Sequence, residues 1–150
     1  MSFQKNLDVI YFCKQKINFS GGFFMLKATE LLKKAGTFYV ATVEGDQPRV
    51  RPFGATAEIN GKTYICMNNT KKVYNQLLAN PKLEITGMVD GKWFRIEAKA
   101  IRDNTLEART EFLNQTPIQM YKPDDGLYEV FCLTDVVGTI ESFTEPKETF

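Results

Sequence analysis

Two dipeptides, Asn60-Gly61 and Asp90-Gly91, constrain the fold of this chain more than any other feature. Each stands between two segments rich in β-branched and aromatic residues, and such dipeptides are the strongest short-range signals of a tight β-hairpin. The four segments that they join are expected to be strands, at residues 55–59, 63–67, 82–89 and 92–102. Antiparallel hairpins are therefore expected to dominate the middle of the sequence.

Further short elements surround these hairpins. β-Branched and aromatic residues predict strands at 37–43 (apolar on both faces), 49–53, 127–133 and 138–143. Three helices are expected, at 26–35 before Gly36, at 70–79 before Asn80-Pro81, and at 105–114 after the cap candidates Asp103-Asn104. Residues 144–150 are expected to form a polar tail. Without an internal repeat or a linker, this pattern predicts a mainly β (α+β) fold, an antiparallel barrel with peripheral helices.

Residues 1–24 differ in composition from the remainder. They carry a charge of +2, whereas residues 25–150 sum to −1, and Met25 opens a well-patterned helix. We interpret 25–150 as the domain and 1–24 as an extension, either a leader before a natural start at Met25 or a helix packed on the domain. Asp8 precedes the short apolar run 9–13, lysines follow it, and no small-residue cleavage site appears, so an export signal is not expected.

The sequence contains no histidine, and its three cysteines, Cys13, Cys66 and Cys132, are far apart. Ser-His-Asp and Cys-His nucleophilic sites, His-ligated zinc and histidine acid–base catalysis are therefore excluded. Without a C-x-x-C motif, we expect no metal site and interpret the cysteines as buried thiols in a reducing cytoplasm. No apolar run approaches the ~20 residues of a transmembrane helix, so no membrane partner is expected.

Two cationic features indicate a bound anion. Arg49 and Arg51 stand two residues apart on an expected strand, so their side chains leave one face roughly 6–7 Å apart. Pro52 follows and removes a ladder donor, which is typical of an edge, a bulge or a ligand-facing backbone.

The second cationic feature is the segment Asn68-Asn69-Thr70-Lys71-Lys72 at the start of an expected helix. Lysines in a first helical turn oppose the macrodipole, but unpaired N–H groups, a hydroxyl and two ammonium groups suit a phosphate. Each feature alone is more typical of a solvated surface than of a binding site. Together they favour one anion site that includes Arg49, Arg51, Lys71 and Lys72.

The expected strand 92–102 has two distinct faces. Phe94 and Ile96 alternate with residues of the opposite character and belong to the barrel core. The other face combines the only tryptophan, Trp93, with Arg95, Glu97 and Lys99. That composition suits a subunit interface or the edge of a cofactor site as well as a solvent face.

Five motifs follow one another in a specific order. They are Gln47-Pro48-Arg49-Val50-Arg51-Pro52-Phe53, the Asn60-Gly61 hairpin, Tyr64-Ile65-Cys66-Met67-Asn68-Asn69-Thr70-Lys71-Lys72, Leu77-Leu78-Ala79-Asn80-Pro81 and Trp93-Phe94-Arg95-Ile96-Glu97-Ala98-Lys99-Ala100. In this order the sequence resembles the pyridoxamine 5'-phosphate oxidase-like family of FMN-binding split barrels, from about Leu26 to Phe143. The resemblance implies a split-barrel homodimer with FMN at the subunit interface.

The resemblance also implies roles for individual residues. Arg51 matches the phosphate-binding arginine, with Arg49 beside it. The other matched positions are Pro52 and Phe53 (backbone at the isoalloxazine), Met67 and Asn68 (lining the flavin), Thr70, Lys71 and Lys72 (phosphate), and Trp93 (approaching from the partner subunit). The C-terminus lacks the Arg- and His-containing substrate motif of true pyridoxamine phosphate oxidases, and the ending resembles small bacterial members instead.

The sequence therefore predicts a cytoplasmic, homodimeric FMN flavoprotein. We expect an oxidoreductase that passes electrons or hydride between a reduced nicotinamide and a small acceptor, with no catalytic residue assigned. The alternative is a non-catalytic flavin-binding redox sensor or carrier. A single-stranded nucleic-acid binder using Arg49, Arg51, Phe53 and Tyr64 is disfavoured by the −1 charge of residues 25–150, and haem handling by the absence of histidine.

Overall fold

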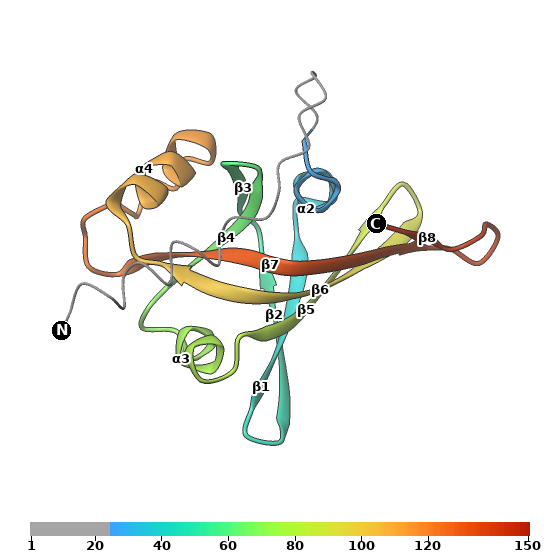
Figure 1. Ribbon diagram of the computed structural model, residues 1–150, viewed down its shortest axis with the longest axis horizontal. Helices are drawn as coiled ribbons and strands as arrows, with labels where there is room; N and C mark the ends of the chain where they lie inside the picture. The colour runs from blue at the N-terminus through green and yellow to red at the C-terminus, as the bar shows by residue number, and fades with distance from the viewer. Residues whose placement is uncertain (1–24) are drawn as a thin grey trace.

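The computed structural model describes residues 25–150, so the interpretation of residues 1–24 and of Cys13 lies outside the described part. This part contains three helices and eight strands (Figure 1). In chain order they are α2 (Lys27–Ala35), β1 (Phe38–Glu44), β2 (Gln47–Phe53), β3 (Thr56–Ile59), β4 (Lys62–Asn68), α3 (Lys72–Ala79), β5 (Lys82–Val89), β6 (Lys92–Asp103), α4 (Leu106–Gln115), β7 (Tyr128–Glu141) and β8 (Glu148–Thr149). No helix among them is long and apolar enough to cross a membrane.

All the strands belong to one antiparallel sheet. Its order is β2-β1-β5-β6-β7-β4-β3, with β8 added on β7, so the path does not close on itself. Both predicted hairpins are present, because β3 pairs with β4 and β5 pairs with β6. Asn60 and Asp90 have φ values of 50° and 53°, and the glycine after each is also left-handed, as a type I′ turn requires. The predicted split barrel with peripheral helices is confirmed.

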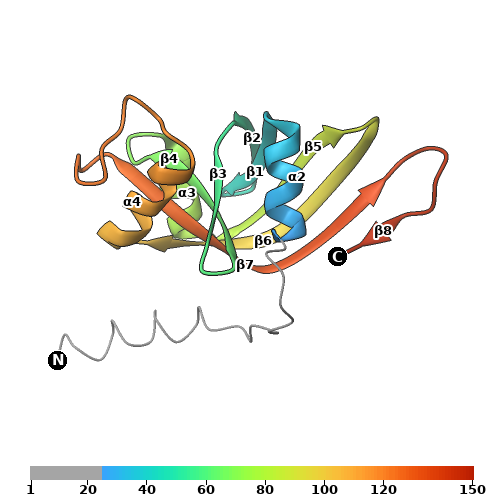
Figure 2. The same cartoon turned by 90° about the horizontal axis from the view of Figure 1, so that it is seen from above.

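Two groups of buried side chains hold the sheet and helices together. The main core includes Phe38, Val40, Ile85 and Phe94, and α2 and α3 cover it. The second core lies beneath α4, which packs against β3 and β7 (Figure 2). Helices α2 and α3 thus pack on the main core, α2 against β3, β4 and β5 and α3 against β1, β4 and β6, while α4 packs on the second core.

The predicted strands 127–133 and 138–143 are one continuous strand, β7. The interpretation of a break between them was wrong because Thr134 and Asp135 interrupt the apolar pattern without ending the pairing. β7 carries one extra residue opposite the interval from Glu97 to Lys99, where the register shifts, and Asp135 adopts φ 52°. A β-bulge absorbs such an extra residue and bends the strand.

Part of the predicted polar tail 144–150 forms a strand, β8. β8 pairs with β7, and the ring of Phe150 packs against the main core.

The N-cap of α4 is Thr105, whose hydroxyl oxygen accepts a hydrogen bond from Ala108 N. Asp103, one of the two predicted caps, instead accepts a hydrogen bond from the Thr105 hydroxyl. Strand β1 is apolar on both faces as predicted, but Tyr39, on its second face, is 47% exposed.

Candidate functional site

Arg51 is the most firmly held residue of the predicted anion site. From β2, its Nη1 donates to Val40 O at 3.1 Å and to Thr42 Oγ1 at 2.7 Å, both on β1. Its Nη2 donates to Gln76 Oε1 of α3 at 2.6 Å. Thr42 Oγ1 donates to the same Gln76 oxygen at 2.6 Å. A strand and a helix thus meet at one guanidinium group.

Arg51 has no carboxylate partner among the described residues. All three of its hydrogen bonds go to uncharged oxygens, whereas Arg49 pairs with Glu44 at 2.8 Å. Burial and then the nearby charge of Arg49 hold the pKa of Arg51 below its usual value. A guanidinium has five N–H donors, so two remain for a ligand. A partly buried cation of this kind suits a bound anion such as phosphate.

The start of α3 lies on the same side as Arg51. Lys72 is the first residue of the helix and Gln76 is four residues later, so both lie on one helical face. Lys71 precedes the helix as its N-cap, and no ion pair of either lysine occurs within residues 25–150. The structure therefore directs the predicted Lys72 and Arg51 toward one region.

The turn before α3 is organised by Asn68. Its Oδ1 accepts hydrogen bonds from Thr70 N at 2.9 Å and from the Thr70 hydroxyl at 2.8 Å. The side chain of Asn68 therefore shapes the loop that carries the lysines. Met67, by contrast, is buried in the main core, so only its backbone can face a ligand.

Pro52 and Phe53 lie at the end of β2, which is an edge strand. β2 pairs only with β1, and Phe53 packs its ring against Phe38 with centroids 6.2 Å apart. The outer backbone groups of an edge strand are not used in the sheet. The edge position that Pro52 indicated is thus present, and backbone groups there can meet a ligand.

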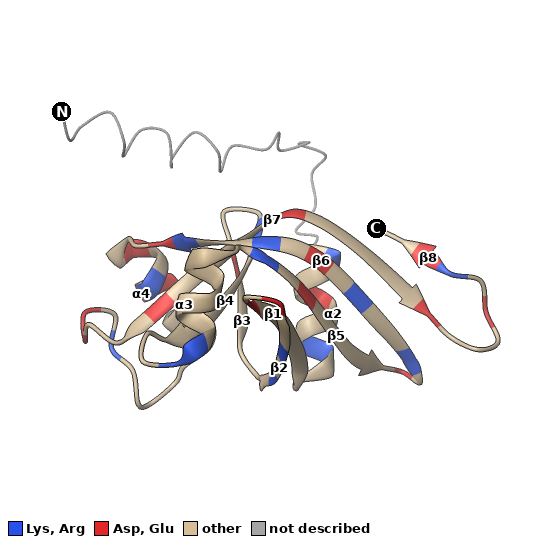
Figure 3. Ribbon diagram, turned by 90° about the horizontal axis from the view of Figure 1, so that it is seen from below, with Lys and Arg blue, Asp and Glu red and all other residues tan. Residues whose placement is uncertain are grey.

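Trp93 lies far from these residues within one protomer. It is at the start of β6, whereas α3 ends beside the other end, where Ala100 N donates to Pro81 O. By register, Arg51 lies three strands from Ile96 of β6, and Trp93, three residues before Ile96, points to the opposite face of the sheet. The six residues from Trp93 to Lys99, near the end of α3, span about 20 Å. Basic and acidic residues are interspersed along β6 between them (Figure 3). One protomer therefore does not bring Trp93 to Arg51.

The family of the chain follows from its sequence together with this architecture. Residues 25–134 match the sequence family described as pyridoxamine 5'-phosphate oxidase. The chain belongs to this family. No curated protein matches the sequence.

Solved structures agree with membership of the pyridoxamine 5'-phosphate oxidase family. A NimC/NimA family protein from Clostridium acetobutylicum is 47% identical, with a TM-score of 0.81, over 84% of this chain and 90% of that one. An FMN-binding protein related to pyridoxamine 5'-phosphate oxidase, from Nostoc punctiforme, is 14% identical with a TM-score of 0.57, over 81% and 82%. A haem-binding protein from Mycobacterium smegmatis is 14% identical with a TM-score of 0.65, over 82% and 57%. The last two show a shared fold.

Sequence reasoning missed Thr42 and Gln76 in this pyridoxamine 5'-phosphate oxidase family member. The apolar pattern of this helix points to Val73, Tyr74, Leu77 and Leu78 as its buried face, but Gln76 is buried and Leu78 is 52% exposed. The only signal in the sequence was the spacing of four residues between Lys72 and Gln76. A buried glutamine is held by its hydrogen-bond partners, which a single sequence does not display.

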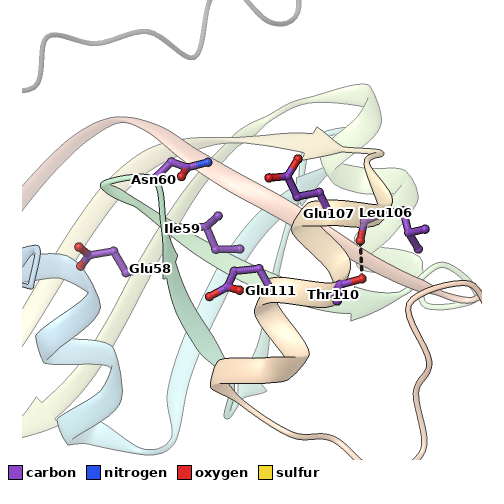
Figure 4. Close-up of a pocket in the computed structure, with 7 residues that line it drawn as sticks. All are labelled: Glu58, Ile59, Asn60, Leu106, Glu107, Thr110 and Glu111. Carbon is purple, nitrogen blue, oxygen red and sulfur yellow. Dashed lines mark hydrogen bonds between the residues drawn. The ribbon is translucent and has the colours of Figure 1, made fainter.

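A cavity of about 550 Å³ lies elsewhere, between β3 and α4 (Figure 4). Its walls carry three carboxylates, Glu58, Glu107 and Glu111, and no basic side chain. Like charges repel, so this cavity does not suit a phosphate. Within the described residues, no three carboxylate or thiol side chains, those of this cavity included, are arranged to hold a metal ion. The cationic residues near α3 are the better candidate site.

Proposed function

We propose that this protein binds FMN, with the phosphate held by Arg51 and by Lys72 at the start of α3. The observation that carries the proposal is the partly buried guanidinium of Arg51, whose hydrogen bonds within residues 25–150 all go to neutral oxygens. A phosphate would supply the missing negative charge and two further acceptors. Arg49 and Lys71 would add positive charge around the phosphate, and the Thr70 hydroxyl would lie beside them.

The same proposal includes a homodimer with FMN between the protomers. Trp93 is three strands from Arg51 and points to the opposite face of the sheet, so a second copy is the means to bring a tryptophan to the cofactor. Large apolar side chains on one face of the neighbouring strands β2, β1 and β5 support this arrangement, because Tyr39, Val50 and Met88 are 47%, 68% and 60% exposed. Exposed apolar side chains gathered on one sheet mark an interaction surface.

We further propose an oxidoreductase that passes electrons or hydride between a reduced nicotinamide and a small acceptor in the cytoplasm. The bound flavin supplies the redox chemistry. The residues of this chain bind and orient it: Arg51 and Lys72 hold the phosphate end, and the backbone near Pro52 and Met67 lines the ring. Without histidine, no side chain here is assigned as a general acid or base.

Titration of the purified protein with FMN tests the binding proposal. We expect FMN to bind and its fluorescence to change, and Arg51→Ala with Lys72→Ala to lose this binding. Two charge-assisted contacts of about 1.5 kcal/mol or more each correspond to a loss in affinity of about a hundredfold. Lys62→Ala, at the far end of β4, is the matched control and should bind as the parent does. Absence of binding by the parent protein would refute the proposal.

A second measurement separates an enzyme from a carrier. Under anaerobic conditions, addition of reduced nicotinamide to the FMN-loaded protein should bleach the flavin absorbance. Addition of an electron acceptor should then restore the absorbance. Bound FMN that is never reduced would instead support the alternative, a non-catalytic redox sensor or carrier.

A further inference from the structure

The segment 142–150, here the C-terminal arm, turns back along β7 (Figures 1 and 2). Its residue Phe143 contacts Trp93. The ring centroids of Phe143 and Trp93 are 5.0 Å apart, with 56° between the ring planes. Phe143 is 97% exposed, so burial does not account for its position. The ring of Phe143 thus joins the beginning of the arm to the indole of Trp93 on β6.

The end of the arm is fixed on Gly138 of β7. Gly138 N donates to a Phe150 oxygen at 2.8 Å, and Phe150 N donates to Gly138 O at 2.9 Å. A Cβ atom at position 138 would lie 2.1 Å from the Phe150 ring, which is too close for two non-bonded carbon atoms. A methyl group at position 138 would therefore displace the far end of the Phe150 ring, which packs on the main core.

Two ion pairs attach the middle of the arm to the neighbours of Trp93. Lys92, the residue before Trp93, pairs with Glu145 of the arm. Glu141, which lies opposite Trp93 on β7, pairs with Lys147 of the arm at 3.4 Å. The arm is thus held on both sides of the indole as well as against its ring.

We propose that the C-terminal arm is a positioning device that fixes the ring of Trp93 for the cofactor site of the second protomer. The inference rests on the proposed function, in which Trp93 approaches the flavin bound by the partner subunit. A half-buried tryptophan at a strand end has several accessible rotamers, and an aromatic neighbour restricts them. A ring that is fixed before binding loses less entropy when the cofactor arrives, which increases affinity.

Trp93 is the only tryptophan of the chain, so protein fluorescence reports on this residue alone. Without FMN, Phe143→Ala should change the emission and increase quenching by acrylamide, because the indole loses its aromatic neighbour and moves more freely. Gly138→Ala should do the same by displacing Phe150, and Phe143→Tyr should restore the parent signal. Unchanged emission and quenching in Phe143→Ala, which alters an exposed side chain and leaves folding intact, would overturn the proposal.

Two variants serve as matched controls. Met120→Ala removes another exposed side chain, one in the loop before β7, where Met120 is 77% exposed. Gly54→Ala adds a methyl group where the nearest atom, Gly36 O, is 3.7 Å away, an ordinary contact. Both should keep the parent fluorescence, and a change as large as that of Phe143→Ala would overturn the assignment of the effect to the arm.

FMN titration then tests the positioning role. Loss of one aromatic pair should weaken FMN binding about fivefold in Phe143→Ala, with recovery in Phe143→Tyr. FMN affinity equal to the parent's, despite altered Trp93 fluorescence, would overturn the positioning role and leave the proposed function intact. Failure of the parent to bind FMN would refute the proposed function and this role with it, while the fluorescence would still decide whether the arm fixes Trp93.

Discussion

Two partly buried arginines differ in what surrounds them. The Arg102 guanidinium donates from Nε and Nη2 to the two carboxylate oxygens of Glu129, both at 2.9 Å, and lies 5.7 Å above the Tyr74 ring. The hydrogen-bonded carboxylate of Glu129 raises the pKa of Arg102, whereas burial lowers that of Arg51. Arg102 is thus neutralised within the fold and stabilises it, while Arg51 is an electrostatic cost until an anion binds.

Cys66 is a residue that the fold removes from thiol chemistry. Burial raises the pKa of its thiol from 9.0 to about 12. Only the thiolate reacts with alkylating reagents, so at pH 8 we expect Cys66 to be labelled by iodoacetamide far more slowly in the native protein than in urea. Mass spectrometry of the labelled peptides measures each cysteine separately. Equal native and unfolded labelling rates would contradict this prediction.

The same pKa shift has a consequence for stability at alkaline pH. In the unfolded chain the thiol ionises above pH 9.0, whereas in the folded chain it stays protonated to about pH 12. The protonated form therefore contributes stability below pH 9.0 that is lost as the pH rises toward 12. The free energy of unfolding in urea should fall over this range, and less steeply in Cys66→Ala.

At the scale of elements, α3 is joined to the sheet by Gln76. Its Oε1 accepts hydrogen bonds from both Arg51 and Thr42 at 2.6 Å. Gln76→Glu would give Arg51 a carboxylate within the fold, so the guanidinium would no longer need an external anion. We expect thermal stability to be kept or increased while FMN affinity falls about tenfold, since the carboxylate competes with the phosphate.

Because Gln76→Glu should keep or increase thermal stability while it lowers FMN affinity, a general loss of folding cannot produce the expected result. Gln76→Met removes the acceptor without adding charge, so it should lower thermal stability and leave Arg51 less firmly placed. Calorimetry and FMN titration of both variants measure the two quantities. Tighter FMN binding by Gln76→Glu would show that the phosphate does not lie at Arg51.

Elements set by local chemistry were predicted well, and those set by distant pairing were not. The hairpins at Asn60-Gly61 and Asp90-Gly91 depend on adjacent residues that accept a left-handed backbone, so the sequence displays them. The continuity of β7 depends on the pairing of Thr134 and Val137, on either side of the bulge at Asp135, with β6. The arm depends on contact between Phe150 and Gly138. A single sequence does not display contacts between segments far apart.

On the scale of the whole molecule, the candidate site was only partly predictable. The sequence identified Arg51 and Lys72 because their residue types and positions suit a phosphate, and the fold directs both toward one region. It did not reveal Thr42 or Gln76, which become polar contacts only when α3 meets β1. Trp93 is three strands away from Arg51 and on the opposite face of the sheet, so its predicted role depends on a second protomer.

A mixing experiment tests whether each cofactor site is shared between protomers. Arg51→Ala and Trp93→Ala should each weaken FMN binding in homodimers, because every site then lacks one of its residues. In a heterodimer of the two variants, one site combines the unaltered Arg51 of one protomer with the unaltered Trp93 of the other. After subunit exchange, about one quarter of all sites should therefore recover parent affinity. If Arg51 and Trp93 of the same protomer served one site, every site in the mixture would stay defective, and the titration would show no tight-binding fraction.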